Sequence, residues 1–364
     1  MLRAWKLGLP AALAAGVLLA GCGGGGDDDI SNYGESGPFD VGVTFLMLPG
    51  DRPVDVWYPA EGGQTSDLFT HNLNDPWPES IRSKVPQVPD SVVDAYPEAQ
   101  ASAAGPFPVI LESHGFGSSR RDGALNHRHL ASWGFIVIAP EHFERNRATV
   151  TGQPVEFEVM DSVDVLLAAL ALVEEASLTE GSVLAGAVDS GLIAVDGVSA
   201  GGRAALDLGN DPRIGAVIGR APAGPGTPDS GVPVLLIASD RDVAVDIDGV
   251  RKMYDEMASP KGLAVILDGG HNTFTDACAV IREAGGLDIE AFVEATGFPA
   301  ELLEFGNNGC TEEYVDPAAV WPAINHLQVA HIRWALGIDP SDEALAVDYI
   351  KETYGALLAE YMRG

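Results

Sequence analysis

A serine lies between two glycines at the end of an apolar run near the middle of the chain. The run Leu-Ile-Ala-Val at 192–195 leads directly into DGVSAGG at 196–202, and the residues after Ser199 favour a helix over 200–208. A strand that becomes a helix within so few residues needs a sharp turn, which small residues on both sides of the serine permit. The pattern therefore predicts a βα unit with Ser199 at its turn.

Strand-like runs alternate with helical segments over most of the chain, and this predicts an α/β fold. Helical spacing of apolar residues covers 157–176, 200–208 and 245–257, and the tail from about 317 to the end is expected to be helical. Such alternation is typical of βαβ units, so we expect a mostly parallel sheet covered by helices on both faces. The eight predicted strands are 41–48, 54–58, 109–112, 135–139, 192–195, 214–218, 232–238 and 263–267.

Two N-terminal features refine this prediction. The first two runs are separated by Pro-Gly-Asp at 49–51, a turn signal that predicts an antiparallel hairpin at one edge of the sheet. Residues 61–105 are rich in Pro, Ser and Asp, and we expect an irregular excursion over the surface with short helical pieces at most. The predicted domain runs from residue 38 to 364.

The N-terminus has the pattern of an export signal. Two basic residues precede a short apolar stretch at 7–20, which predicts a signal peptide over 1–21. The stretch ends at Cys22 in a sequence that resembles the bacterial lipobox, in which the cysteine is lipidated. We therefore expect an exported protein anchored by lipid to the cell envelope, at the outer membrane, with 22–37 as a flexible tether. An ordinary signal peptide, giving a periplasmic or extracellular protein, is the alternative.

Net charge and cysteine content limit the classes of binding partner and the cellular compartment that fit this sequence. The net charge is −32, and near −34 once the two basic residues of the signal are removed, which argues against nucleic acid and anionic substrates. Apart from Cys22, the chain has Cys278 and Cys310, which are the one intrachain pair available for a disulfide in an exported protein. Two buried free thiols are the alternative.

A serine hydroxyl becomes an effective nucleophile only beside a base that a third group orients. Glycines two residues before and after a serine in a strand–turn–helix context are typical of a nucleophile elbow, whose partners follow in the order Asp or Glu, then His. His271 follows the strand predicted at 263–267, and Asp240 and Asp242 follow the one at 232–238. We predict Ser199 as nucleophile, His271 as base and Asp242 as acid, with Asp240 as the alternative acid.

An oxyanion hole needs two backbone N–H groups. The residue after the nucleophile, Ala200, supplies one, and Phe116 in the loop Ser-His-Gly-Phe-Gly at 113–117 is the candidate for the second. His114 in this loop is expected to hold it by hydrogen bonds. Phe143 and Trp77 are candidates for lining an acyl pocket.

Metal binding is not predicted. His127 and His129 are two residues apart on a predicted helix and so do not share a face, which argues against a metal pair. We therefore expect no metal and no cofactor.

Four stretches carry a resemblance to a known superfamily: ESHGFGSSR, HLASWGFIVIAPEHFER, VDGVSAGGRAAL and DGGHNTFTD. Over about 41–276 the chain resembles the α/β-hydrolase superfamily, in its platelet-activating-factor acetylhydrolase and dienelactone-hydrolase-like branch. The resemblance implies ester hydrolysis through an acyl-enzyme without a metal. By position it makes Ser199 the nucleophile, His271 the base, and Phe116 and Ala200 the oxyanion donors.

One departure from the acetylhydrolase pattern concerns the acid. In those enzymes the acid follows the next strand after the nucleophile, where this chain has Gly-Arg-Ala-Pro at 219–222. The acid is then Asp240 or Asp242, as in dienelactone hydrolases and bacterial polyester hydrolases, which argues against a phospholipid-acetyl specificity. We expect a serine hydrolase that cleaves a small-molecule ester or a lipid-like substrate. A binding lipoprotein with the same fold, and a peptidase or thioesterase, are the alternatives.

Overall fold

The computed structural model describes residues 30–62, 67–85, 87–152, 157–283, 293 and 305–364. The chain divides into two units, 1–31 and Asn32–Gly364, and the elements below belong to the second. The predicted signal peptide 1–21 and Cys22 lie outside the described residues. Within the ranges given, no helix is long and apolar enough to cross a membrane.

One large sheet forms the centre of the second unit, and the predicted α/β-hydrolase fold class is confirmed. Its strand order is β12-β11-β10-β9-β8-β6-β7-β2-β1-β5, while β3 and β4 pair separately. Strands β6 to β11 are parallel to one another, whereas β2 pairs antiparallel with both β1 and β7. The strands are β1 (Asp40–Leu48), β2 (Arg52–Ala60), β3 (Phe69–His71), β4 (Ser91–Val93), β5 (Tyr96–Pro97), β6 (Phe107–Ser113), β7 (Ile136–Pro140), β8 (Val188–Val198), β9 (Ile214–Arg220), β10 (Val234–Ser239), β11 (Lys261–Ile266) and β12 (Leu358–Arg363).

The sheet contains the eight predicted strands and, among the described residues, two more. β5 is a two-residue strand of the 61–105 excursion that pairs with the edge strand β1. β12 corrects the prediction of a tail that is helical to its end, because this segment pairs antiparallel with β11. Its residues, LAEYMR, are mostly good helix formers, and the backbone pairing available at the edge of the sheet outweighs that preference.

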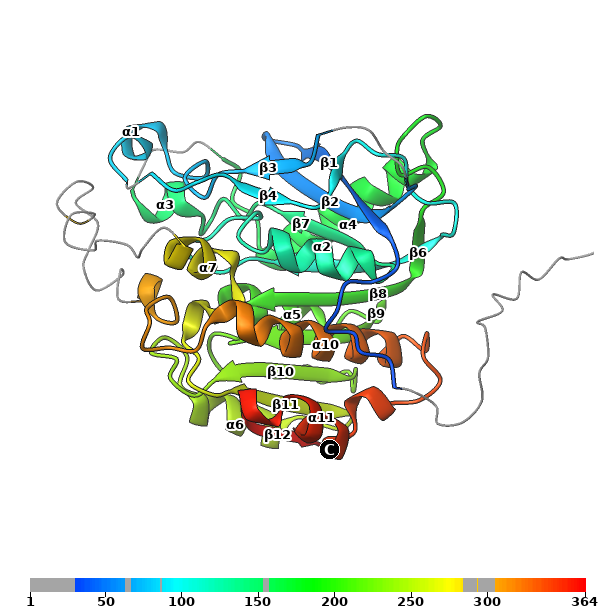
Figure 1. Ribbon diagram of the computed structural model, residues 1–364. Coiled ribbons are helices and arrows are strands. Elements are labelled where there is room, and N and C mark those ends of the chain that lie inside the picture. Colours follow the sequence, from blue (N-terminus) through cyan, green and yellow to red (C-terminus); the bar gives the residue numbers. More distant parts are fainter. Residues whose placement is uncertain (1–29, 63–66, 86, 153–156, 284–292, 294–304) are drawn as a thin grey trace, which may run out of the picture. The chain divides into compact units, whose positions relative to one another are not determined.

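The helices lie on both faces of the sheet (Figure 1). Three of them begin at an aspartate whose side chain accepts a backbone N–H of the first turn: Asp161 before α4, Asp246 before α6 and Asp316 before α10. The cap at Asp161 explains why α4 starts five residues later than predicted. The helices are α1 (Glu79–Arg82), α2 (Ala124–Ser132), α3 (Arg147–Val150), α4 (Ser162–Leu178), α5 (Ala200–Leu208), α6 (Ile247–Glu256), α7 (Asp276–Glu283), α10 (Pro317–Ala335) and α11 (Val347–Tyr354), with 3-10 helices η1 (His271–Phe274), η2 (Glu343–Leu345) and η3 (Gly355–Leu357).

Two apolar cores, one on each face, hold these layers together. Alternate residues of a strand enter opposite cores: in β8, Ala194 belongs to the core that also includes residues of α2, α10 and α11, whereas Val195 belongs to the core that includes residues of α4, α5 and α6. Because both faces are covered, the parallel strands are buried along nearly their whole length, as the continuous apolar runs predicted. The sheet is thereby a rigid support for the loops at its ends.

The second unit includes residues before position 38. The Tyr33 side chain is buried and its hydroxyl donates to Asp339 Oδ2 at 2.6 Å. The Gly37 N–H donates to Ser132 Oγ at 2.9 Å, and Trp133 Nε1 donates to the Glu35 carbonyl at 2.8 Å. Residues 32–37, which the sequence assigned to the tether, therefore pack on the domain.

Candidate active site

Ser199 occupies a strained turn between β8 and α5. Its φ of 57° and ψ of −118° lie in a region that residues with a side chain rarely adopt, which costs on the order of 1–3 kcal/mol. A Cβ on Gly197 would lie 2.3 Å from the Gly201 carbonyl oxygen, and a Cβ on Gly201 would lie 1.8 Å from the Ser113 carbonyl oxygen. Both glycines are therefore sterically required, which is the close approach that the sequence pattern predicted.

Backbone hydrogen bonds hold this turn in place. The Ser199 N–H donates to the Arg220 carbonyl at 2.9 Å, and the Ser199 carbonyl accepts from Arg203 and Ala223 N–H, both at 3.0 Å. Ser199 is half-buried and lies against the loop after β6, since a Cβ on Gly115 would be 3.3 Å from Ser199 Cβ and 3.9 Å from Ser199 Oγ. The strained serine is thus fixed by its neighbours and open on one side.

Asp242 and His271 form a hydrogen-bonded pair. Asp242 Oδ2 lies 2.8 Å from His271 Nδ1, and the two side chains are 2% and 12% exposed. Asp242 Oδ1 accepts from the N–H groups of Ala244 and Val245, both at 2.8 Å. Because the carboxylate accepts, the hydrogen-bond network assigns the ring proton to Nδ1 and leaves Nε2 as an acceptor.

The alternative acid, Asp240, has no contact of this kind. Its Oδ1 atom is buried without a hydrogen-bond partner in the described part of the chain. Burial is the largest cause that raises the pKa of the Asp240 carboxyl above its usual value. Of the two candidates, the structure brings Asp242 to His271.

The predicted residues lie at one edge of the sheet. Ser199 follows β8, Asp242 follows β10 and His271 follows β11, and the carboxyl ends of these parallel strands point the same way (Figure 1). Ser199 and His271 share no hydrogen bond within the residues that the structure describes. Such contacts are often long before substrate binds, so the link between nucleophile and base stays a prediction.

The loop after β6 is held by His114 and Arg145. His114 Nδ1 donates to the Gly115 carbonyl and Nε2 accepts from the His142 N–H, both at 2.9 Å. Arg145 Nε and Nη2 donate to the His114 carbonyl at 3.0 and 2.8 Å. Burial is the largest cause that lowers the pKa of His114, so its ring is neutral at neutral pH. His114 thus has the loop-holding contacts that we expected.

Phe116 and Ala200, the predicted oxyanion donors, have available N–H groups. Neither donates a hydrogen bond to another described residue. The Phe116 side chain is 60% exposed. Their role in binding an oxyanion stays a prediction.

A buried group of charges beneath the elbow was not predicted. Arg220 Nε donates to Asp196 Oδ1 at 2.9 Å and Nη2 to Glu112 Oε1 at 3.3 Å, and Glu112 also lies 3.4 Å from His127 Nε2. All four residues are buried. The sequence did give a signal, because β6, β8 and β9 each contain a charged residue within an apolar run. The ion-pair partners come from different strands, however, so the pairing cannot be inferred from neighbouring residues.

The two predicted pocket residues make other contacts. The Phe143 ring lies 5.6 Å from the Phe157 ring and under the Arg52 guanidinium, and Trp77 lies under the Arg147 guanidinium. Their part in a substrate pocket stays a prediction. Among the described residues, no group of three His, Cys, Asp or Glu side chains could hold a metal ion.

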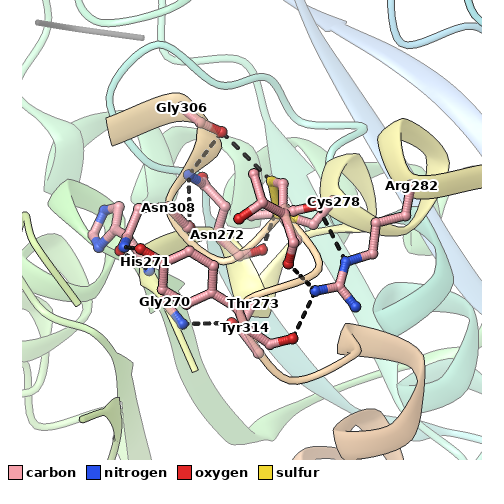
Figure 2. The surroundings of a disulfide bond; sticks show 12 residues. Gly270, His271, Asn272, Thr273, Cys278, Arg282, Gly306, Asn308 and Tyr314 are labelled. Carbon is pink, nitrogen blue, oxygen red and sulfur yellow. Dashed lines mark hydrogen bonds between the residues drawn. A yellow bond between two sulfur atoms is a disulfide. The ribbon is translucent and has the colours of Figure 1, made fainter. Parts of the chain in front are cut away.

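The predicted disulfide is present, and it lies beside the base. Cys278 in α7 is bonded to Cys310, and the segment before Cys310 packs against the start of η1 (Figure 2). Asn308 in this segment is buried and hydrogen-bonded to the backbone of His271. Sequence analysis did not single out Asn308, because an asparagine in a loop 37 residues beyond His271 gives no local signal.

A family model described as PETase, PET hydrolase-like, matches residues 95–286, which include Ser199, Asp242 and His271. The chain belongs to the PET hydrolase-like family. This family lies within the α/β-hydrolase superfamily, and its members are ester hydrolases of the serine hydrolase class. The narrower resemblance to platelet-activating-factor acetylhydrolases and dienelactone hydrolases stays a prediction. No curated protein matches the chain.

Proposed function

We propose that this PET hydrolase-like protein cleaves carboxylic esters through a triad of Ser199, His271 and Asp242. The observation that carries the proposal is the partly buried Asp242–His271 hydrogen bond at the carboxyl ends of the parallel strands, where the strained Ser199 turn also lies. A backbone held in a rarely populated conformation is typical of a functional site. The family match supports ester hydrolysis in general.

In the first half-reaction, Ser199 Oγ attacks the ester carbonyl carbon while His271 Nε2 takes the hydroxyl proton. Asp242 keeps the ring in the tautomer that leaves Nε2 free to accept, and stabilises the imidazolium that forms. The carbonyl oxygen becomes an oxyanion, which the N–H groups of Phe116 and Ala200 bind. The bond to the alcohol then breaks, and His271 returns its proton to the departing oxygen.

The second half-reaction releases the acid. A water molecule gives a proton to His271 Nε2 and attacks the carbonyl carbon of the acyl-enzyme. The bond to Ser199 Oγ breaks, Oγ regains the proton from His271, and the carboxylic acid leaves. No residue other than these is needed for atom and proton balance.

The proposed substrate is an ester whose acid part is apolar or aromatic, including the chains of a polyester. Three exposed apolar side chains belong to the loops of the proposed site: Phe116 at 60%, Val243 at 58% and Phe305 at 41% exposure. Phe116 lies in the oxyanion loop, Val243 follows Asp242, and the Phe305 carbonyl accepts from Asn272 beside His271. Apolar side chains left open to solvent around a site favour an apolar ligand.

We also propose export and anchoring through a lipid on Cys22, as the lipobox-like sequence suggests. Detergent phase partitioning of the protein expressed with its signal, beside Cys22→Ala, tests this. We expect wild type in the detergent phase and the variant in the aqueous phase. An aqueous wild type would reject the anchor.

The test of the catalytic proposal is hydrolysis of p-nitrophenyl esters of graded acyl length by the protein lacking residues 1–22. We expect activity that Ser199→Ala abolishes and that Ser230→Ala, a matched change in an exposed loop, leaves intact. Fluorophosphonate labelling should follow the same pattern. Activity that survives Ser199→Ala would reject the nucleophile. Faster cleavage of matched anilides or thioesters would reject the ester preference, and polyester films test the substrate class.

A further inference from the structure

We propose that Asn308 is a positioning residue that holds the loops of Asp242 and His271 at the separation their hydrogen bond needs. The proposal rests on the triad proposed above. Asn308 Oδ1 accepts from the His271 N–H at 2.5 Å and from the Val243 N–H at 3.2 Å. One oxygen therefore connects the backbone of the base to the residue directly after the acid.

The other end of the same side chain binds the residue before the acid. Asn308 Nδ2 donates to the Arg241 carbonyl at 3.0 Å and to Tyr314 Oη at 2.8 Å. Asn308 thus forms hydrogen bonds to the backbone on both sides of Asp242. Both amide protons and both oxygen lone pairs of its side chain take part in hydrogen bonds. Asn308 is 3% exposed, so water does not replace these partners readily.

Asn308 is itself firmly placed (Figure 2). Its carbonyl accepts from the Asn272 N–H at 2.8 Å, and the Cys278–Cys310 disulfide fixes the chain two residues further on. Arg282 donates to the carbonyls of Cys310 at 3.1 Å and Tyr314 at 2.8 Å. A side chain anchored in this way can impose a distance on its partners.

Close packing adds to these bonds. A Cβ on Gly270 would lie 2.3 Å from Gly309 N and 2.6 Å from the Asn308 carbonyl carbon. The segment that carries Asn308 therefore lies directly on the backbone leading into His271. This segment is beyond the residues 95–286 that the family model matches, so the device belongs to this chain's own C-terminal part.

The functional consequence follows from geometry. The hydrogen bonds of the Asn308 side chain go to the backbones on either side of Asp242 and at His271, and to Tyr314, rather than to the side chains of the pair, so it acts on the two backbones from which those side chains project. Misplacing catalytic groups by about 1 Å can cost on the order of 10²-fold in rate. Losing Asn308 should therefore lower kcat while substrate binding is largely kept.

The experiment compares Asn308→Leu with Asn307→Leu, the same change one residue earlier at a side chain without a hydrogen bond to the described residues. For Asn308→Leu we expect kcat on p-nitrophenyl butyrate to fall about 10- to 100-fold with KM within about twofold. The strongly deshielded proton resonance of the His271 Nδ1–H···Asp242 bond should broaden or vanish. Asn307→Leu should match wild type in all three.

A folded Asn308→Leu with wild-type kcat and resonance would overturn the proposal. Where circular dichroism shows that this variant does not fold, Asn308→Asp replaces it, because a carboxylate keeps the acceptor for His271 and loses the donor to Arg241. We expect a three- to tenfold fall in kcat with a shifted resonance, and no change in either would overturn the proposal. The resonance reports the Asp242–His271 hydrogen bond without any need for catalysis. Failure of this proposal is therefore distinguishable from failure of the proposed nucleophile, which an active Ser199→Ala variant would reveal.

Discussion

Replacing Asp242 by asparagine tests directly whether Asp242 is the acid of the proposed triad. Asp242 Oδ1 accepts from the N–H groups of Ala244 and Val245, while Oδ2 faces His271 Nδ1. In Asp242→Asn the amide oxygen stays on the two backbone donors, because the flipped amide would place its NH2 against two N–H groups. The NH2 group must then face His271 and donate to Nδ1.

This orientation forces the wrong tautomer on the base. With Nδ1 as acceptor, the ring carries its proton on Nε2 and cannot take one from Ser199. The loss in a triad where the acid becomes an amide is about 10⁴ in kcat, equivalent to about 5.5 kcal/mol of transition-state stabilisation. The two backbone hydrogen bonds survive, so the melting temperature should change little.

The assay is steady-state hydrolysis of p-nitrophenyl butyrate at pH 8, with the rate of fluorophosphonate labelling as a second readout. Asp240→Asn is the matched control, since it makes the same change two residues earlier, and it should keep at least half of the wild-type kcat. Substantial activity in Asp242→Asn together with loss in Asp240→Asn would refute the reasoning and make Asp240 the acid.

Three further outcomes are expected. Gly201→Ala should give an insoluble or inactive protein, because its Cβ would lie 1.8 Å from the Ser113 carbonyl oxygen; soluble yield and probe labelling check this, and an active variant would contradict the close approach. Replacing both Cys278 and Cys310 by serine should lower the free energy of unfolding by about 3–4 kcal/mol, because the disulfide closes a loop with a sequence separation of 32. Urea denaturation measures this change, and an unchanged midpoint would contradict it. Burial raises the pKa of Asp276 to about 7, so the folded state holds this proton more tightly than the unfolded state, whose aspartate titrates near 3.9. The contribution of this group to the free energy of unfolding is complete below about pH 4. It decreases by about 1.4 kcal/mol per pH unit as the pH rises to 7. Urea denaturation of Asp276→Asn at several pH values should lack this decrease, and the same pH dependence in wild type and variant would contradict the prediction.

Local rules were enough to predict eight strands of the large sheet and the candidates Ser199 and His271. Each depends on residues next to it in the chain: two glycines that permit a sharp turn, or a strand that ends just before a polar loop. The choice between Asp240 and Asp242 remained open because both follow the same strand. The structure distinguishes them by the turn, in which Asp242 binds the next backbone N–H groups and so faces His271.

Other features depend on contacts between distant segments, which no local pattern reports. β12 is a strand because the edge of β11 is available to pair with it, against the helical preference of its residues. Asn308 lies beside His271 in a segment that the disulfide and Arg282 hold in place, 37 residues further along the chain. The buried carboxyl groups of Asp196 and Glu112 are both paired with Arg220, which comes from a different strand, β9.

That arginine also limits how the enzyme can be redesigned or can evolve. Position 220 ends β9, and in the acetylhydrolases that the sequence resembles the acid follows the corresponding strand, so moving the acid there would be a short route to a different architecture. Here an aspartate at 220 would stand beside Asp196 and Glu112 without the cation that neutralises them, and breaking a buried pair costs about 3–5 kcal/mol. An acid at position 220 would therefore require replacement of both neighbouring carboxylates as well, and these buried charges disfavour that position relative to the loop of Asp242, where we propose the acid.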